Sequence, residues 1–175
     1  MAIRFVNRGV MDATFRELLR GKKAHVDPVA SLADIPAATA GRTVAGYPHS
    51  VWQIVGHMNY WMDYELRRIA GERPTYPELA VESWPTSVSP ASDDEWRGER
   101  DRLAALIEKL ADLSESSPAA LEALVDSANE TPGKPYSLEA VLWQTLVHNS
   151  YHAGQIALLL RCFGLWPPKS GSDSW

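Results

Sequence analysis

Apolar side chains recur at helical spacing through residues 138–163, and this run constrains the fold more than any other part of the chain. Ser137 stands at the N-cap position of the run, and Gly164 stands where a helix would end. The pattern therefore predicts a long helix with one face packed against the rest of the chain. That face carries Leu138, Val141, Leu142, Ile156, Leu159, Leu160 and Phe163.

The same spacing predicts three further main helices and no strand. The first covers residues 6–19. The second starts after Ser50, which has Gln53 three residues later in the pattern of a capping box, and Gly71 ends it. The third starts after Ser92, where three acidic residues occupy the first turn and match the helix dipole.

The connections between these helices are rich in proline and tryptophan. Shorter helical pieces are expected within residues 24–39 and after Ser117. Residues 72–91 are long enough to cross over and leave the second and third helices parallel. Residues 129–136 read as a turn-rich link. We therefore expect residues 1–175 to form a single all-α domain built as a four-helix bundle.

Charge and hydropathy exclude several classes of protein. The net charge of −5, with no basic run, argues against a nucleic-acid binder. No apolar stretch approaches the ~20 residues that span a bilayer, so no membrane role is expected. The single cysteine, Cys162, has no partner for a disulfide within the chain. These features predict a cytoplasmic protein.

Two histidines interrupt the apolar face of the last predicted helix. His148 and His152 are four residues apart, so they lie one above the other, and Gln155 shares their face. His57 lies on the apolar stripe of the second predicted helix, 91 positions before His148. Periodicity leaves two interpretations open: buried histidines that are hydrogen-bonded to the backbone, or ligands of one metal ion. Spacing alone does not show that His57 reaches the other two.

The chain resembles the DinB/YfiT-like superfamily of metal-dependent enzymes. The resemblance rests on His57 within the second helix and on the pattern His-Asn-x-x-His-x-Gly-Gln over residues 148–155. The segment Glu82-Ser83-Trp84-Pro85 and the closing Gly164-Leu165-Trp166-Pro167-Pro168 also fit. The resemblance implies a four-helix bundle with an up-down-down-up arrangement, often dimeric. It also implies one divalent metal ion held by His57, His148 and His152.

Three neutral imidazoles leave the full charge on a divalent ion and one position open for water or substrate. Such ligands suit zinc, nickel, copper or iron, and we expect zinc or nickel. Gln155, Gln53 and Asn149 are candidates to support a ligand imidazole or to contact a bound water. Each also has a simpler explanation, such as capping a buried backbone group or facing solvent.

These observations lead to three functional hypotheses. The first is a hydrolase in which the metal ion activates bound water for attack on a small-molecule substrate. The second is an S-transferase that uses a low-molecular-weight thiol, and the third is a non-catalytic metal- or ligand-binding dimeric bundle. A peptidase is unsupported, because the glutamate of the pattern His-Glu-x-x-His is missing here. The homodimer implied by the resemblance suits Trp52, Trp143 and Val147, which we expect to be exposed.

Overall fold

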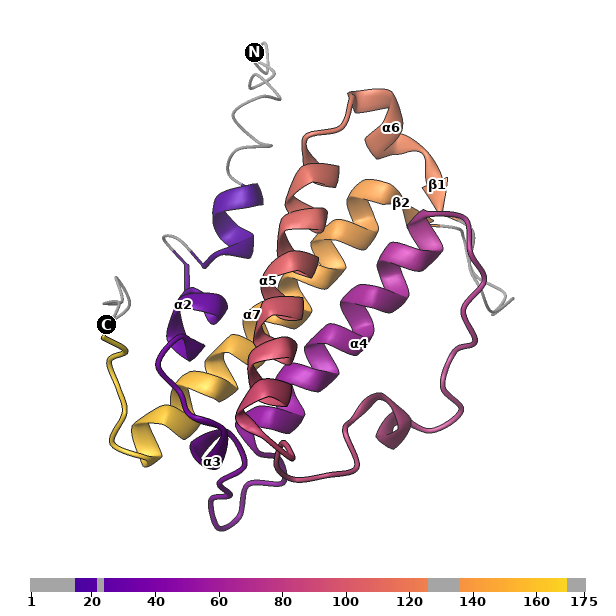
Figure 1. Cartoon of the computed structure of the whole chain (residues 1–175). Helices are drawn as coiled ribbons and strands as arrows, with labels where there is room; N and C mark the ends of the chain where they lie inside the picture. Colours follow the sequence, from indigo (N-terminus) through magenta and orange to yellow (C-terminus); the bar gives the residue numbers. More distant parts are fainter. Residues whose placement is uncertain (1–14, 22–23, 126–135, 170–175) are drawn as a thin grey trace.

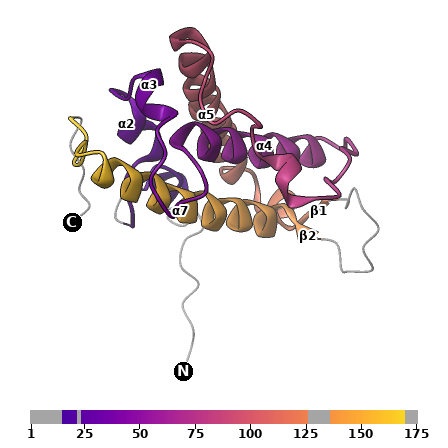
Figure 2. The same ribbon diagram turned by 90° about the horizontal axis from the view of Figure 1, so that it is seen from below.

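The computed structural model describes residues 15–21, 24–125 and 136–169, and these residues are mostly helical (Figure 1). Three long helices dominate this part of the chain: α4 (Val51–Ile69), α5 (Asp93–Ser114) and α7 (Leu138–Cys162). Helix α4 packs against both α5 and α7, and α4 runs beside α7 in both views (Figure 1 and Figure 2). The all-α prediction is confirmed.

Short elements join and cover these helices. They are α2 (Pro28–Leu32), α3 (Ala37–Ala40), the 3₁₀ helix η1 (Ala80–Ser83), α6 (Pro118–Glu122), and the strands β1 (Leu124–Val125) and β2 (Tyr136–Ser137). The prediction that the chain has no strand was wrong, because β1 and β2 form an antiparallel pair. Two residues per strand are too few to show alternation in the sequence. The predicted helix over residues 6–19 is described only at 15–19, which is helical. Most of the predicted link over 129–136 lies outside the described residues.

The helix starts follow the capping residues found in the sequence. The Ser50 hydroxyl accepts from the backbone N–H of Gln53, and the Gln53 side chain accepts from the backbone N–H of Ser50, so the predicted capping box is present. The Ser92 and Ser137 hydroxyls likewise accept from the backbone N–H groups of Glu95 and Ala140 at the starts of α5 and α7. Gly164 adopts a positive φ of 73° directly after the last turn of α7, a conformation that glycine adopts without strain.

The prediction that Trp52 is exposed was wrong. Trp52 is only 7% exposed, and its indole N–H donates to the Ser87 hydroxyl at 3.0 Å. The proline-rich connection folds back over this face of α4, which helical periodicity could not show. Trp143 and Val147 on α7 are exposed, as expected, together with Tyr151 and Leu158.

The first described helical residues anchor the N-terminal side of the chain to both α5 and α7. Phe15 and Leu19 are buried, and the Phe15 ring meets the Trp143 ring edge-to-face at 5.1 Å. Arg16 forms ion pairs with three carboxylates on α5 or directly after it. They belong to Glu108, Asp112 and Glu115. Residues 15–19 thus contact both α5 and α7.

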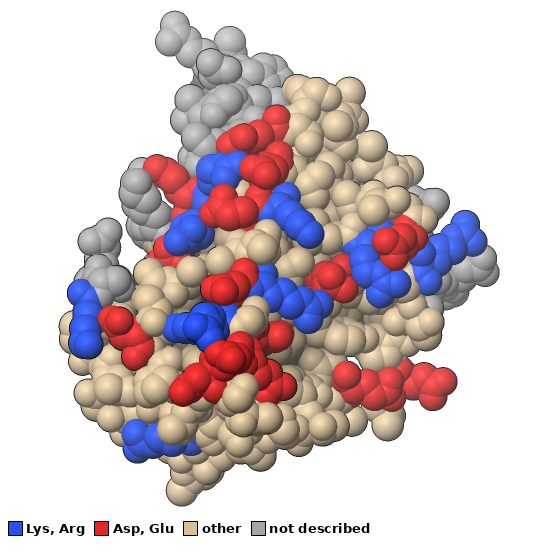
Figure 3. All heavy atoms as spheres, viewed as in Figure 1, with Lys and Arg blue, Asp and Glu red and all other residues tan. Residues whose placement is uncertain are grey.

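Acidic and basic side chains alternate over the visible face of the molecule rather than separating into patches (Figure 3). This mixed surface agrees with the absence of a basic run in the sequence. Among the described helices, none combines the length and the apolar character that crossing a bilayer requires.

Candidate metal centre

The three histidines singled out in the sequence meet between α4 and α7. The Nε2 atom of His148 lies 3.3 Å from that of His57 and 3.1 Å from that of His152. His57 and His152 are buried and His148 is half-buried. The fold therefore brings a residue of α4 against a pair fixed one helical turn apart on α7.

The partners of His57 determine which of its ring nitrogens carries the proton. Its Nδ1 atom lies 3.2 Å from the backbone oxygen of Ser83 and 3.0 Å from the Ser83 hydroxyl oxygen. That hydroxyl donates to the backbone oxygen of Ala80, so it accepts from His57. A carbonyl oxygen can only accept. The proton therefore resides on Nδ1, and the lone pair of Nε2 faces the other two histidines.

Gln155 fixes His152 in the same way. The side-chain oxygen of Gln155 lies 2.7 Å from Nδ1 of His152 and accepts its proton. The Nε2 lone pair of His152 then also points toward the centre of the cluster. Orientation of a ligand imidazole by a hydrogen bond at its outer nitrogen is the usual arrangement at metal sites.

All three imidazoles are neutral at pH 7. Burial, together with the neighbouring His152 and His148, lowers the pKa of His57 to about 3. Burial lowers the pKa of His152 to about 4, again with a contribution from His148. Burial also lowers the pKa of His148. With their protons held at Nδ1, His57 and His152 direct the lone pairs of their Nε2 atoms toward Nε2 of His148.

This geometry fits a metal ion. The Nε2 lone pairs of His57 and His152 are available to a cation, and a neutral His148 can supply a third from its own Nε2. Zinc with nitrogen ligands at ~2.0–2.1 Å in a tetrahedron separates those nitrogens by about 3.3–3.4 Å. The observed separations of 3.1 and 3.3 Å are close to that value. His57, His148 and His152 can thus hold a metal ion.

The other two polar candidates lie near the cluster but in different surroundings. Asn149 is buried and donates to the sulfur of Met62 at 3.1 Å. Its side-chain oxygen and Nδ1 of His148 are both buried without a hydrogen-bond partner among the described residues. Gln53 donates to the backbone oxygen of Pro85 at 3.2 Å, in addition to closing the capping box. Its side chain therefore holds the connection beside the site rather than a ligand imidazole.

Trp84, like Ser83, is a residue of the site to which the sequence analysis assigned no role. Its ring stacks on His57 at 3.8 Å and on His49 at 3.7 Å, each within 9° of parallel. Two rings so close to the same indole must lie on its opposite faces. Trp84 therefore shields His57 from water on one side. The only sequence signal was its place in the segment Glu82-Ser83-Trp84-Pro85, which was noted for the resemblance alone.

Gly56 allows this connection to approach α4. A Cβ atom at Gly56 would lie 2.3 Å from Cγ of Pro85. We expect Gly56→Ala to lower the free energy of unfolding by about 1–3 kcal/mol, because the connection must move away. Urea unfolding measures this loss. Gly98→Ala on α5 is the matched control, since nothing lies within 4 Å of its Cβ position and the exchange should be neutral or stabilising. Equal stability of the two variants would contradict the close approach.

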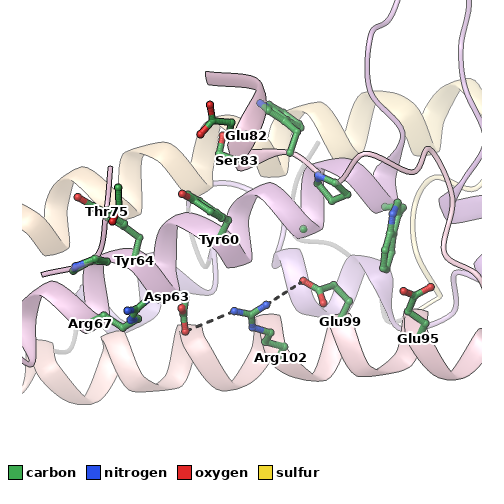
Figure 4. Close-up of a pocket in the computed structure, with 15 residues that line it drawn as sticks. Tyr60, Asp63, Tyr64, Arg67, Thr75, Glu82, Ser83, Glu95, Glu99 and Arg102 are labelled. Carbon is green, nitrogen blue, oxygen red and sulfur yellow. Dashed lines mark ion pairs between the residues drawn. The ribbon is translucent and has the colours of Figure 1, made fainter. Parts of the chain in front are cut away.

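Two cavities flank the cluster. One of about 680 Å³ lies among α4, α5 and the connection that contains η1 (Figure 4). None of the three histidines lines it, and there Arg102 pairs with Asp63 at 3.6 Å and Glu99 at 3.9 Å. The other, of about 640 Å³, lies between α4 and α7 and has His148 in its wall. Of these two cavities, the one between α4 and α7 therefore reaches the histidine cluster.

The fold and the cluster define a mostly helical protein with a three-histidine group able to hold a metal ion. The model of the DinB superfamily matches residues 24–156, a span that includes all three histidines. The chain belongs to the DinB superfamily. Comparisons with curated proteins and with solved structures find no match.

Proposed function

We propose that this protein is a metal-dependent enzyme and that its reaction is a hydrolysis. The carrying observation is the convergence of three neutral Nε2 atoms. Among the described residues, no fourth histidine, cysteine, aspartate or glutamate joins the group. Structural zinc sites use four protein ligands, whereas catalytic sites use three and leave one position for water or substrate. The cavity beside His148 supplies the space for a substrate at that position.

In this proposal the three histidines bind the ion, and neighbouring side chains orient them and exclude water. A divalent ion, zinc or nickel, would supply Lewis acidity at neutral pH. Ser83 and Gln155 keep His57 and His152 in the tautomer that binds metal. Trp84 covers the His57 ring, so that solvent reaches the centre from the His148 side. Neutral ligands leave the charge of the ion undiminished.

Transfer to a small thiol is the alternative reaction. No carboxylate forms a hydrogen bond with the three imidazoles among the described residues, so the cluster has no attached proton acceptor. Hydrolysis must then obtain its proton acceptor elsewhere. A thiol is a stronger acid than water and needs less assistance to lose its proton. This observation supports thiol transfer as the alternative to hydrolysis.

Cobalt substitution tests the proposed open position directly. We expect the cobalt(II) protein to show a four-coordinate visible spectrum that changes on addition of azide, because an external ligand can enter. A thiol such as 2-mercaptoethanol should add a sulfur-to-cobalt charge-transfer band if the transferase hypothesis is correct. A spectrum that neither ligand alters would indicate a closed, structural site and would contradict both enzymatic hypotheses.

We also propose the up-down-down-up arrangement of four helices, with residues 6–19 as the first. The burial of Phe15 and Leu19 and the ion pairs of Arg16 with α5 support this placement. The long connection between α4 and α5 allows these two helices to follow one another without a tight hairpin.

A further inference from the structure

The cavity beside His148 has an aromatic wall. Trp61 and Tyr64 of α4 meet Tyr76 of the following connection, with ring centroids 5.4 to 6.0 Å apart. Tyr136 of β2 lines the cavity as well. Tyr76 is 49% exposed and Tyr136 is 54% exposed, so both present ring surface that no other described residue covers. Such a wall suits a flat or apolar ligand.

A charged pair lines the same cavity farther along α4. Arg68 is only 9% exposed, and its Nη1 donates to Oε2 of Glu65 at 2.7 Å. The Nε atom of Arg68 is buried and has no hydrogen-bond partner among the described residues. A buried charged donor without a partner is costly. Nε and Nη2 form the edge with which a guanidinium grips a carboxylate through two parallel hydrogen bonds.

The charges of the pair select among anions. One guanidinium edge offers two donors, which match the two oxygens of a carboxylate. Glu65 forms its ion pair with Nη1 of Arg68, so its negative charge lies beside this edge. A dianion such as a phosphate monoester would add a second negative charge beside this carboxylate and would be repelled. The pair therefore favours a monoanionic carboxylate.

The spacing along α4 sets the length of the ligand. Arg68 follows His57 by eleven residues, which corresponds to about 16 Å along a helix. We propose that the substrate is an elongated carboxylate: its carboxylate binds Arg68, its apolar or aromatic body lies on Trp61 and Tyr76, and its reacting group lies at His148. This inference rests on the proposed function for the reacting end only.

Calorimetric titration of the full-length chain with 6-phenylhexanoate and with its primary amide tests the inference. The two probes share their length and apolar body and differ in charge. Both the zinc-loaded and the chelator-treated protein are titrated. We expect the carboxylate to bind about tenfold more tightly than the amide, or better, in both forms, because a charge-assisted bidentate contact is lost in the amide.

Glu65→Gln/Arg68→Gln is the critical variant, because it removes both charges and leaves no buried charge unpaired. It should abolish the preference for the carboxylate. Arg67→Gln is the control, since Arg67 pairs with Glu72 and lines the cavity of Figure 4 instead. It should keep the preference.

The outcomes separate the two proposals. A preference that appears only with zinc and survives in the double variant would mean that the carboxylate binds the ion, and it would overturn the role of Arg68. Equal binding of the two probes, or no binding of the carboxylate, would overturn it too. The protein could also fail to retain zinc and still prefer the carboxylate over the amide. That result would support the carboxylate site and would contradict the proposal of a metal-dependent enzyme.

Discussion

Replacing His57, His148 or His152 with alanine should weaken zinc binding by more than about 100-fold in each case. About 10–100-fold is the usual loss when a residue that merely supports a ligand is removed, and loss of a ligand itself must exceed it. Two remaining imidazoles hold zinc with only part of the coordination that three provide. Competition with a chelating dye measures the affinity, and metal content after purification gives the stoichiometry.

The chain offers controls for this experiment. His25→Ala should leave zinc affinity unchanged, because His25 bonds to the Ser150 hydroxyl and to the backbone oxygen of Val26, away from the cluster. Gln155→Ala should lower zinc affinity by about 10–100-fold, since it removes the acceptor that orients His152. If any one of the three histidine variants retained the affinity of the unaltered protein, that histidine would not be a ligand.

Zinc affinity should depend weakly on pH down to about 5.5. Three imidazoles of ordinary pKa, ~6.5, would be mostly protonated at pH 5.5, and competition by protons would weaken binding by about 1,000-fold relative to pH 8. Here the pKa of His57 is about 3 and that of His152 about 4, so neither takes up a proton in this range. Only His148 could compete, and even at its ordinary pKa the loss would be about tenfold at most.

Titrations with zinc at pH 8.0, 6.5 and 5.5 would check this expectation. For the metal-free protein, the lowered pKa values reduce the free energy of unfolding at acidic pH. Unfolded imidazoles bind protons below about pH 6.5, whereas folded His57 and His152 do not until pH 3–4. The free energy of unfolding should therefore fall as the pH drops below about 6.5. A thousandfold loss of affinity at pH 5.5 would show that the imidazoles titrate normally and that the cluster is not buried as described.

Local features of the sequence predicted the long helices. The contacts between helices and the course of the connections could not be predicted in this way. Ser50, Ser92 and Ser137 mark helix starts because a cap needs only residues within one turn. The pair on α7 could be predicted because the helix itself fixes residues four apart. The approach of His57 depends on how α4 packs against α7, which no spacing encodes.

The path of residues 72–91 explains most of what the sequence could not show. This segment buries Trp52 through Ser87, brings the Ser83 carbonyl to His57 and stacks Trp84 on the same ring. It has little helical or strand periodicity, so its course follows from tertiary contacts such as the approach of Pro85 to Gly56. The membership in the DinB superfamily extends over this segment, but a family match carries no contact geometry.

The division of the cluster between two helices has a mechanical consequence. His148 and His152 move together on α7, while His57 belongs to α4, so the distance of 3.3 Å between His57 and His148 is a gauge of how closely the two helices lie. A separation of α4 from α7 by about an ångström would weaken the binding of an ion by the three histidines. By reciprocity, a bound ion would resist the same displacement and would stiffen the contact between the two helices that line the α4–α7 cavity.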